Sequence, residues 1–202
     1  MKSVVFDIGG VLVDWDPAYL YRTLIPDADM RTVFLRDVCP REWNARCDAG
    51  LPWKDAVAER IALYPAQADL IRAYDERWPE MVAGLLDDVV RIKDDLRAQG
   101  VPLYAITNFS SDKWRLSQTL WPTLADFDGI VVSGDEKIMK PDPRIYHTLL
   151  DRYGLSASDC LFIDDVPANV DGARAVGMHG HVFTNALCLR QALQVFLGGQ
   201  QT

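Results

Sequence analysis

Four groups of polar residues each follow a short apolar run of this sequence. They are Asp7, the pair Thr107 and Asn108, Lys140, and the pair Asp164 and Asp165. Two adjacent carboxylates repel one another unless a cation or hydrogen-bond donors compensate their charge. Several carboxylates contributed by different segments form an oxygen-rich site of the kind that Mg²⁺ prefers. The residue types therefore indicate a site that holds a divalent cation beside a reactive aspartate.

Asp7 is the strongest candidate for a nucleophile. It ends the first apolar run and is followed by Gly9 and Gly10, so it lies on a turn where backbone can approach a ligand closely. Lys140 would supply positive charge to a phosphoryl group, and the Thr107 hydroxyl would donate to its oxygens. Attack of Asp7 on phosphorus would then give a covalent aspartyl-phosphate that water hydrolyses.

The elements that must position these groups can be read from the hydrophobic pattern. Strand-like runs occupy residues 3–6, 102–106, 129–132, 160–163 and 179–183. Helical spacing of apolar residues lies between them and predicts helices at about 81–99 and at 145–154, the second ending at Gly154. Alternating strands and helices predict an α/β fold, a three-layer Rossmann-like core with a parallel sheet. Ligands bind such sheets at the carboxyl ends of the strands.

The segment between the first and second strands is far longer than the roughly dozen residues that a crossover requires. The helix at 81–99 can serve as the crossover, which makes residues 14–79 an insertion. Asp16 followed by Pro17 is typical of a helix start, and the insertion shows no convincing pair of strands. We therefore predict a core formed by residues 1–13 and 80–202, with a small helical cap at 14–79.

Composition narrows the class of partner. The chain has 202 residues, is 49% hydrophobic and 25% charged, and carries a formal net charge of −8. This charge and the absence of a basic run disfavour nucleic acid and anionic membranes as partners. The N-terminal sequence lacks a signal-peptide pattern and the four cysteines are scattered. We expect a cytoplasmic protein, a monomer or a homodimer, with a small phosphorylated molecule as its substrate.

With their neighbours, the four polar groups resemble in order and spacing the four motifs of the haloacid dehalogenase (HAD)-like hydrolase superfamily. The similarity is greatest to sugar-phosphatase-like members, including the N-terminal phosphatase domain of some epoxide hydrolases. It implies a Mg²⁺-dependent phosphatase that acts on a small phosphorylated metabolite, such as a sugar phosphate. It also implies that residues 14–79 are similar to the helical cap of that superfamily.

The resemblance further implies a role for each matching residue. Asp7 would be the nucleophile and a metal ligand. Thr107 and Asn108 would bind phosphate, and Lys140 would orient both the nucleophile and the phosphate. Asp165 would be a metal ligand, and Asp164 a second or indirect one.

One position departs from the pattern of most phosphatases in this superfamily. They carry a second aspartate two residues after the nucleophile, where it protonates the leaving alcohol and later activates water, whereas this chain has Gly9. The Gly9 carbonyl can still bind the metal, but the proton donor is missing, and such a donor is typically worth ~10²–10⁴-fold in rate. Asp14 is the nearest substitute, although it is better explained as a residue of a helix or hinge.

Two other functions remain open. A haloacid dehalogenase would use Asp7 to attack carbon without a metal, and the Asp164–Asp165 pair argues against it because such a pair calls for a cation. A catalytically weak protein that binds a phosphorylated metabolite is supported only by Gly9.

The cap would select the substrate. Residues 43–51 are expected to form an interhelical loop in which Asn44, Arg46 and Asp48 either contact a sugar or remain solvated. The cap tryptophans are expected in its core, with one or two lining the pocket.

Overall fold

A five-stranded parallel sheet forms the centre of the computed structural model, which describes residues 1–198 of the chain. Its strands, in spatial order, are β5 (Gly129–Val132), β4 (Leu103–Thr107), β1 (Ser3–Phe6), β6 (Cys160–Asp164) and β7 (His179–Val182). All the strands that the sequence predicts are therefore present, with ends shifted by at most one residue. The last residues of the predicted core segment, 199–202, lie outside the described residues.

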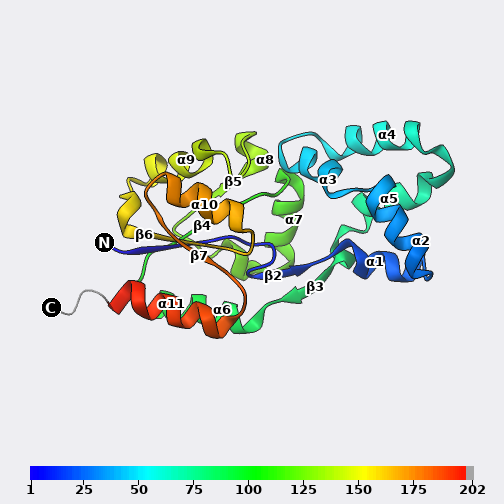
Figure 1. Cartoon of the computed structure of the whole chain (residues 1–202). Coiled ribbons are helices and arrows are strands. Elements are labelled where there is room, and N and C mark those ends of the chain that lie inside the picture. Colours follow the sequence, from blue (N-terminus) through cyan, green and yellow to red (C-terminus); the bar gives the residue numbers. More distant parts are fainter. Residues whose placement is uncertain (199–202) are drawn as a thin grey trace.

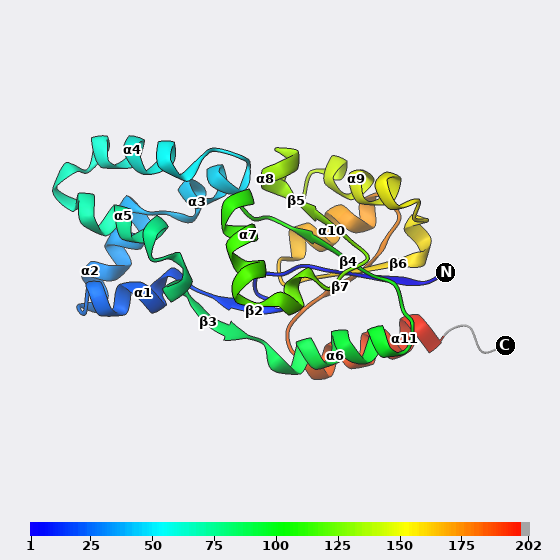
Figure 2. The same cartoon turned by 180° about the vertical axis from the view of Figure 1, so that it is seen from behind.

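Side chains of β1 alternate between the two faces of the sheet, as the period of two in a strand requires. Val4 and Phe6 pack with the helices α6 (Asp87–Ala98) and α11 (Ala186–Gly198), whereas Val5 packs with α9 (Pro143–Tyr153) and α10 (Pro167–Ala175). Figures 1 and 2 show these two helix pairs on opposite sides of the sheet. The predicted α/β fold, a three-layer Rossmann-like core, is thus confirmed.

The helices of the core begin and end at the expected residue types. Their bounds are α6 (Asp87–Ala98), α7 (Ser111–Leu120), α8 (Ser133–Glu136), α9 (Pro143–Tyr153), α10 (Pro167–Ala175) and α11 (Ala186–Gly198). Helix α9 is an example: the Asp142 side chain accepts a hydrogen bond from the backbone N–H of Arg144, Pro143 follows, and Gly154 ends the helix with a φ of 64°. Glycine adopts this left-handed conformation without the steric cost of a Cβ.

The segment between β2 (Val13–Trp15) and β3 (Val82–Leu85) is helical and has its own hydrophobic core (Figure 1). Its helices are α1 (Pro17–Leu24), α2 (Ala28–Val33), α3 (Arg41–Asp48), α4 (Trp53–Leu63) and α5 (Ala68–Glu76), with a π-helical turn at Phe34–Val38. The Asp16 side chain caps α1 and Pro17 follows it, as predicted. Tyr21, Trp43, Trp53 and Tyr74 form the aromatic centre of this cap.

A two-stranded antiparallel ribbon joins the cap to the core. It pairs β2 (Val13–Trp15) with β3 (Val82–Leu85). The prediction of a helix from residue 81 is therefore wrong, because α6 begins only at Asp87. The apolar residues at 81, 85 and 89 fit a helical period, but residues 82–85 pair with β2 instead, and Gly84 lies at a φ of 147° that helices do not use.

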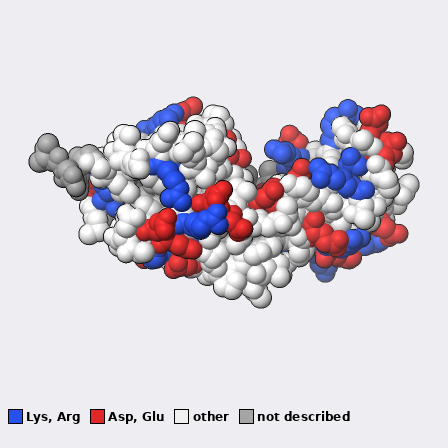
Figure 3. All heavy atoms as spheres, turned by 90° about the horizontal axis from the view of Figure 1, so that it is seen from below, with Lys and Arg blue, Asp and Glu red and all other residues white. Residues whose placement is uncertain are grey.

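Charged side chains of both signs share the face seen in Figure 3, which is turned to show the molecule from below. Exposed ion pairs such as Arg91–Asp88 and Arg190–Asp95 are common among the described residues. On that face the described residues form no extended basic patch, in keeping with the composition. None of the helices within residues 1–198 has both the length and the apolar character needed to cross a bilayer.

Candidate active site

Three polar side chains meet at the carboxyl edge of the sheet because β1 lies between β4 and β6. Phe6 is in register with Ala105 on one side and with Ile163 on the other. Asp7 therefore leaves the sheet next to Thr107, the last residue of β4, and Asp164, the last residue of β6. The parallel register alone thus brings together three residues that are far apart in the sequence.

Lys140 lies between the two buried carboxylates. Its Nζ is 2.7 Å from Asp7 Oδ1 and 2.7 Å from Asp164 Oδ2, and it donates to the Ile106 carbonyl at 3.0 Å. The lysine side chain is 0% exposed, so water cannot weaken these ion pairs. Lys140 therefore holds Asp7 in place and compensates part of the charge at this edge.

Asn108 positions the lysine. Its side-chain Oδ1 accepts from the Lys140 backbone N–H at 2.8 Å, and its Nδ2 donates to the Lys140 carbonyl at 3.0 Å. Both polar atoms of the Asn108 amide are thus used to hold the loop that carries Lys140. The predicted role of Asn108 in binding phosphate stays a prediction.

Three carboxylates offer oxygen atoms that all lie within 4.8 Å of one another, from Asp7, Asp164 and Asp165. With all three ionised, Lys140 balances one of their charges and two remain. An oxygen donor set of this charge fits a hard divalent cation such as Mg²⁺. The residues present therefore fit the ion that the sequence led us to expect.

The two acids of the pair differ in their surroundings. Asp164 is 0% exposed, and Asn169 donates to both of its oxygens at 3.0 Å while Val166 N–H donates to Oδ1 at 2.8 Å. Asp165 is exposed and lies against Gly10. Asp164 is thus fully engaged by protein groups, whereas Asp165 is better placed to offer an oxygen to an ion.

Burial raises the pKa of Asp7 to about 7, although Lys140 acts against this and Asp164 adds to it. The pKa of Asp165 is also raised, first because the surrounding protein partly desolvates its carboxyl group even though the residue is exposed, and then by the neighbouring Asp164 charge. Both shifts come mainly from desolvation of the carboxyl groups, and the Asp164 charge adds to each of them. A divalent cation would favour the ionised form of both carboxyls.

Thr107 ends β4 with its hydroxyl buried, and the Oγ1 atom has no hydrogen-bond partner among the described residues. An unsatisfied buried polar group costs about 1–3 kcal/mol. An oxygen-rich ligand at the strand edge would remove this cost. The chemistry of this atom therefore fits the predicted contact with phosphate, which stays a prediction.

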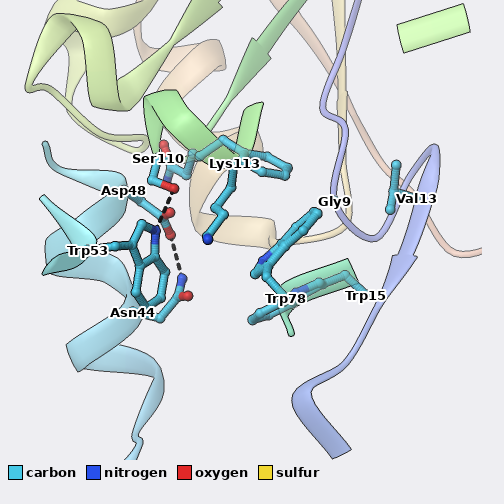
Figure 4. A pocket seen from close by; sticks show the side chains of 11 residues that line it. Gly9, Val13, Trp15, Asn44, Asp48, Trp53, Trp78, Ser110 and Lys113 are labelled. Atoms are coloured by element: carbon cyan, nitrogen blue, oxygen red, sulfur yellow. Dashed lines mark hydrogen bonds between the residues drawn. The ribbon is translucent and has the colours of Figure 1, made fainter. Parts of the chain in front are cut away.

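A cavity of about 80 Å³ lies between the cap and the core (Figure 4). It is lined by Gly9, Val13, Trp15, Asn44, Asp48, Trp53, Trp78, Asn108, Phe109, Ser110 and Lys113. Trp53 Nε1 in the cap donates to Ser110 Oγ in the core at 2.8 Å, and Ser133 Oγ donates to the Asp48 carbonyl at 2.6 Å. These hydrogen bonds hold the cap against the core beside the carboxyl edge of the sheet.

A comparison with protein families shows the family of the chain. Residues 1–177 match the model of the haloacid dehalogenase-like hydrolases. The chain belongs to this hydrolase family. It is also 28% identical to a sesquiterpene phosphatase of Aspergillus oryzae, over 98% of this chain and 97% of that protein.

Solved structures support the fold of this HAD-like hydrolase. A HAD-like family hydrolase from Porphyromonas gingivalis superposes with a TM-score of 0.74 at 21% identity, covering 100% of this chain and 99% of that one. A HAD family enzyme from Bacteroides thetaiotaomicron, in complex with magnesium and inorganic phosphate, has a TM-score of 0.70 at 18% identity. The match covers 91% of this chain and 94% of that enzyme.

The cap of this hydrolase differs from the sequence prediction around residue 46. Residues 41–48 form α3 rather than a loop: Pro40 precedes the helix, and Arg41, Glu42, Ala45 and Arg46 favour it. Asn44 and Asp48 line the cavity, whereas Arg46 forms an ion pair with Glu59 at 2.9 Å on the outside of the cap. Arg46 is therefore removed from the predicted substrate contacts.

Asp14, weighed as a substitute for the missing acid, lies on β2. Both its oxygens accept hydrogen bonds from the Tyr19 hydroxyl, at 2.9 and 3.0 Å, and it does not line the cavity. The structure therefore favours the interpretation of Asp14 as a residue of the helix and hinge region over that of a general acid.

Sequence reasoning did not predict Lys113 as a lining residue. It expected one or two of the cap tryptophans at the pocket, whereas Trp15, Trp53 and Trp78 all line it. The Trp15 Nε1 atom is buried without a hydrogen-bond partner within the described part of the chain. An indole N–H usually finds a partner when buried. The signal available in the sequence was the position of Trp15 two residues after Val13, at the end of the Gly-containing loop that follows Asp7.

Proposed function

We propose that this hydrolase is a Mg²⁺-dependent phosphatase that cleaves a small phosphorylated metabolite through an aspartyl-phosphate intermediate. The observation that carries the proposal is the cluster of Asp7, Lys140 and Asp164 with Asp165 beside it. Similarity over nearly the full chain to a protein named as a phosphatase supports the same reaction.

Asp7 has one oxygen engaged and one available. Its Oδ1 accepts from the Ile8 N–H at 2.7 Å and pairs with Lys140, so Oδ2 is the atom left to attack phosphorus. Lys140 keeps the carboxylate oriented and favours its ionised, nucleophilic form. The unpaired Thr107 hydroxyl would donate to a phosphoryl oxygen as charge develops on it.

Asp7, Asp165 and the Gly9 carbonyl would hold the magnesium ion, and Asp164 would support the site by fixing Lys140. When bound, the ion would polarise the phosphoryl group and offset the negative charge of the carboxylates. The same excess of negative charge argues against a metal-free haloacid dehalogenase, as it did in the sequence.

The residues that line the cavity indicate what kind of substrate it accepts. Aromatic faces of Trp15, Trp53, Trp78 and Phe109 surround it, and Asn44 and Lys113 add polar groups. A mostly apolar wall with a few polar contacts is the usual composition of a site for a small molecule. The part of the substrate that leaves as an alcohol would lie here, and the flat faces of a sugar ring or another compact alcohol would pack against the indole rings.

The proposal is tested by assaying phosphate release from a panel of phosphate esters, with Mg²⁺ and with EDTA. Asp7→Asn should abolish release because an amide does not attack phosphorus, while the protein keeps its thermal melting profile. Asp95→Asn, the same change at an exposed position of α6, is the matched control and should retain activity. Metal-independent turnover, or wild-type turnover by Asp7→Asn, would refute the proposal.

A further inference from the structure

The leaving alcohol of a phosphate ester needs a proton, and the loop after Asp7 offers none. Gly9 occupies the position of the missing acid, and nothing lies within 4 Å of the place where a Cβ would be. The wall of the cavity opposite Gly9 belongs to the cap, and it carries the carboxyl group of Asp48 (Figure 4). A side chain that could supply the proton therefore faces the same space from the other domain.

Hydrogen bonds hold the Asp48 carboxyl at the boundary between cap and core. Asp48 is the last residue of α3, and Asn44, one turn earlier, donates to its Oδ2 at 2.7 Å. From the core, Ser133 Oγ donates to the backbone carbonyl of Asp48 at 2.6 Å, and the N–H of Ser110, which precedes α7, acts to lower the pKa of the carboxyl. Its position is thus set by groups from both sides of the cavity.

The surroundings of Asp48 favour its protonated form. Burial raises the pKa of this carboxyl to about 8. The Ser110 N–H and the Asn44 amide act to lower this pKa, and the Asp112 and Asp7 charges act to raise it. Lys113 lines the same cavity, but its ammonium group is paired with Asp75 in the last turn of α5 and donates to the Asp75 carbonyl at 2.9 Å. No cation therefore cancels the effect of burial within the described part of the cavity wall.

One further cation lies near this part of α3. The aliphatic stem of Lys137 packs against Gly50, two residues after the helix ends, and Cγ of the lysine would be 3.1 Å from a Cβ placed there. The Asp48 carboxyl forms neither an ion pair with Lys137 nor one with any other described residue. A carboxylic acid that is neutral near pH 7 is suited to donate a proton.

We propose that Asp48 is the general acid of this hydrolase, supplied by the cap in place of the acid that Gly9 lacks. The proposal rests on the phosphatase function proposed above. In the first step, an Asp7–phosphorus bond forms, the ester P–O bond breaks with its electron pair moving to oxygen, and the Asp48 proton transfers to that oxygen. In the second, the Asp48 carboxylate takes a proton from the water that attacks phosphorus, and Asp7 leaves with the electron pair of the broken bond.

With Asp48 as the general acid, proton transfer to the leaving group requires a closed cap. The proton donor reaches the cavity only while the cap contacts hold, which include Trp53 with Ser110 and Ser133 with the Asp48 carbonyl. An open cap would leave Asp7 without an acid. Closure would then complete the catalytic site as well as exclude water.

The test compares two esters in wild-type protein and in Asp48→Asn. An alkyl phosphate needs a proton on its leaving group, whereas p-nitrophenyl phosphate releases a stable anion. We expect Asp48→Asn to lower kcat/KM about 10²–10⁴-fold for the alkyl ester and less than about tenfold for the nitrophenyl ester. Asp14→Asn, the same change at the other acid weighed for this role, should leave both values unchanged.

A second measurement uses wild-type protein alone. The ratio of the two kcat/KM values, alkyl over nitrophenyl, should fall as the pH rises through about 8, where Asp48 loses its proton. Equal losses on both esters in Asp48→Asn, or a ratio that does not change with pH, would overturn the inference, since a residue that only holds the cap closed affects both esters alike. No turnover of either ester by wild-type protein with Mg²⁺ would instead overturn the phosphatase function on which the inference rests.

Discussion

Replacing Gly10 with alanine tests whether the Asp165 carboxylate must occupy its observed place. Gly10 has a φ of +73°, and a Cβ at this position would lie 2.4 Å from Asp165 Oδ2 and 2.7 Å from Asp165 Cγ. Such distances are well inside van der Waals contact, so the carboxylate has to move. The change therefore displaces a proposed metal ligand without removing it.

The chain offers a matched control in Gly154. Its φ is +64°, and a Cβ there would meet nothing within 4 Å. Alanine in the left-handed conformation costs about 1–2 kcal/mol at either position. For a protein of this size, each kcal/mol lowers the Tm by about 2–4 °C. Both variants should thus lose a similar amount of stability from the backbone alone.

The affinity for Mg²⁺ should differ between Gly10→Ala and Gly154→Ala. Disturbing the groups that orient a metal ligand typically weakens affinity by ~10–100-fold. We expect this loss in Gly10→Ala and not in Gly154→Ala, as measured by titration calorimetry with Mg²⁺ and by the increase of Tm on adding the ion. Wild-type affinity in Gly10→Ala, with a loss of stability equal to that of Gly154→Ala, would refute the assignment of Asp165 as a ligand held by contact with this loop.

Two further predictions concern the cap. The pKa of Asp48 rises from 3.8 in the unfolded chain to about 8 in the folded protein. The unfolded chain therefore releases this proton at a lower pH than the folded protein does. As the pH rises between these two values, Asp48 makes folding less favourable. The Tm of Asp48→Asn relative to wild type should therefore increase between about pH 5 and about pH 8. A Tm difference that stays constant over this range would contradict a protonated Asp48 in the folded protein. Arg46→Ala should leave kcat and KM unchanged across a phosphosugar panel, since its ion pair with Glu59 is exposed and lies outside the cavity; a changed KM would show that the arginine reaches the substrate.

The polar residues at the carboxyl edge of the sheet could be predicted from the sequence because their positions depend on short-range information. Each polar group comes directly after an apolar run, and a parallel sheet places the carboxyl ends of its strands at one edge. Asp7 and Asp164 could therefore be placed together before the strand order was known. The same local pattern misled at residues 82–85, where an apolar spacing compatible with a helix belongs to a strand that pairs with residues 13–15.

The sequence by itself determined the α/β class, the order of the strands along the chain and the side chains at their ends, because these depend on periodicity and on residue type. Tertiary structure alone decided which cap residues face that edge. Asn44 and Asp48 line the cavity while Arg46, on the same helix, pairs outside it, and this follows from how α3 packs on the core. The raised pKa of Asp48 also depends on the tertiary structure, since it comes first from burial of the carboxyl group and then from the charges of Asp112 and Asp7, which lie on other segments of the chain.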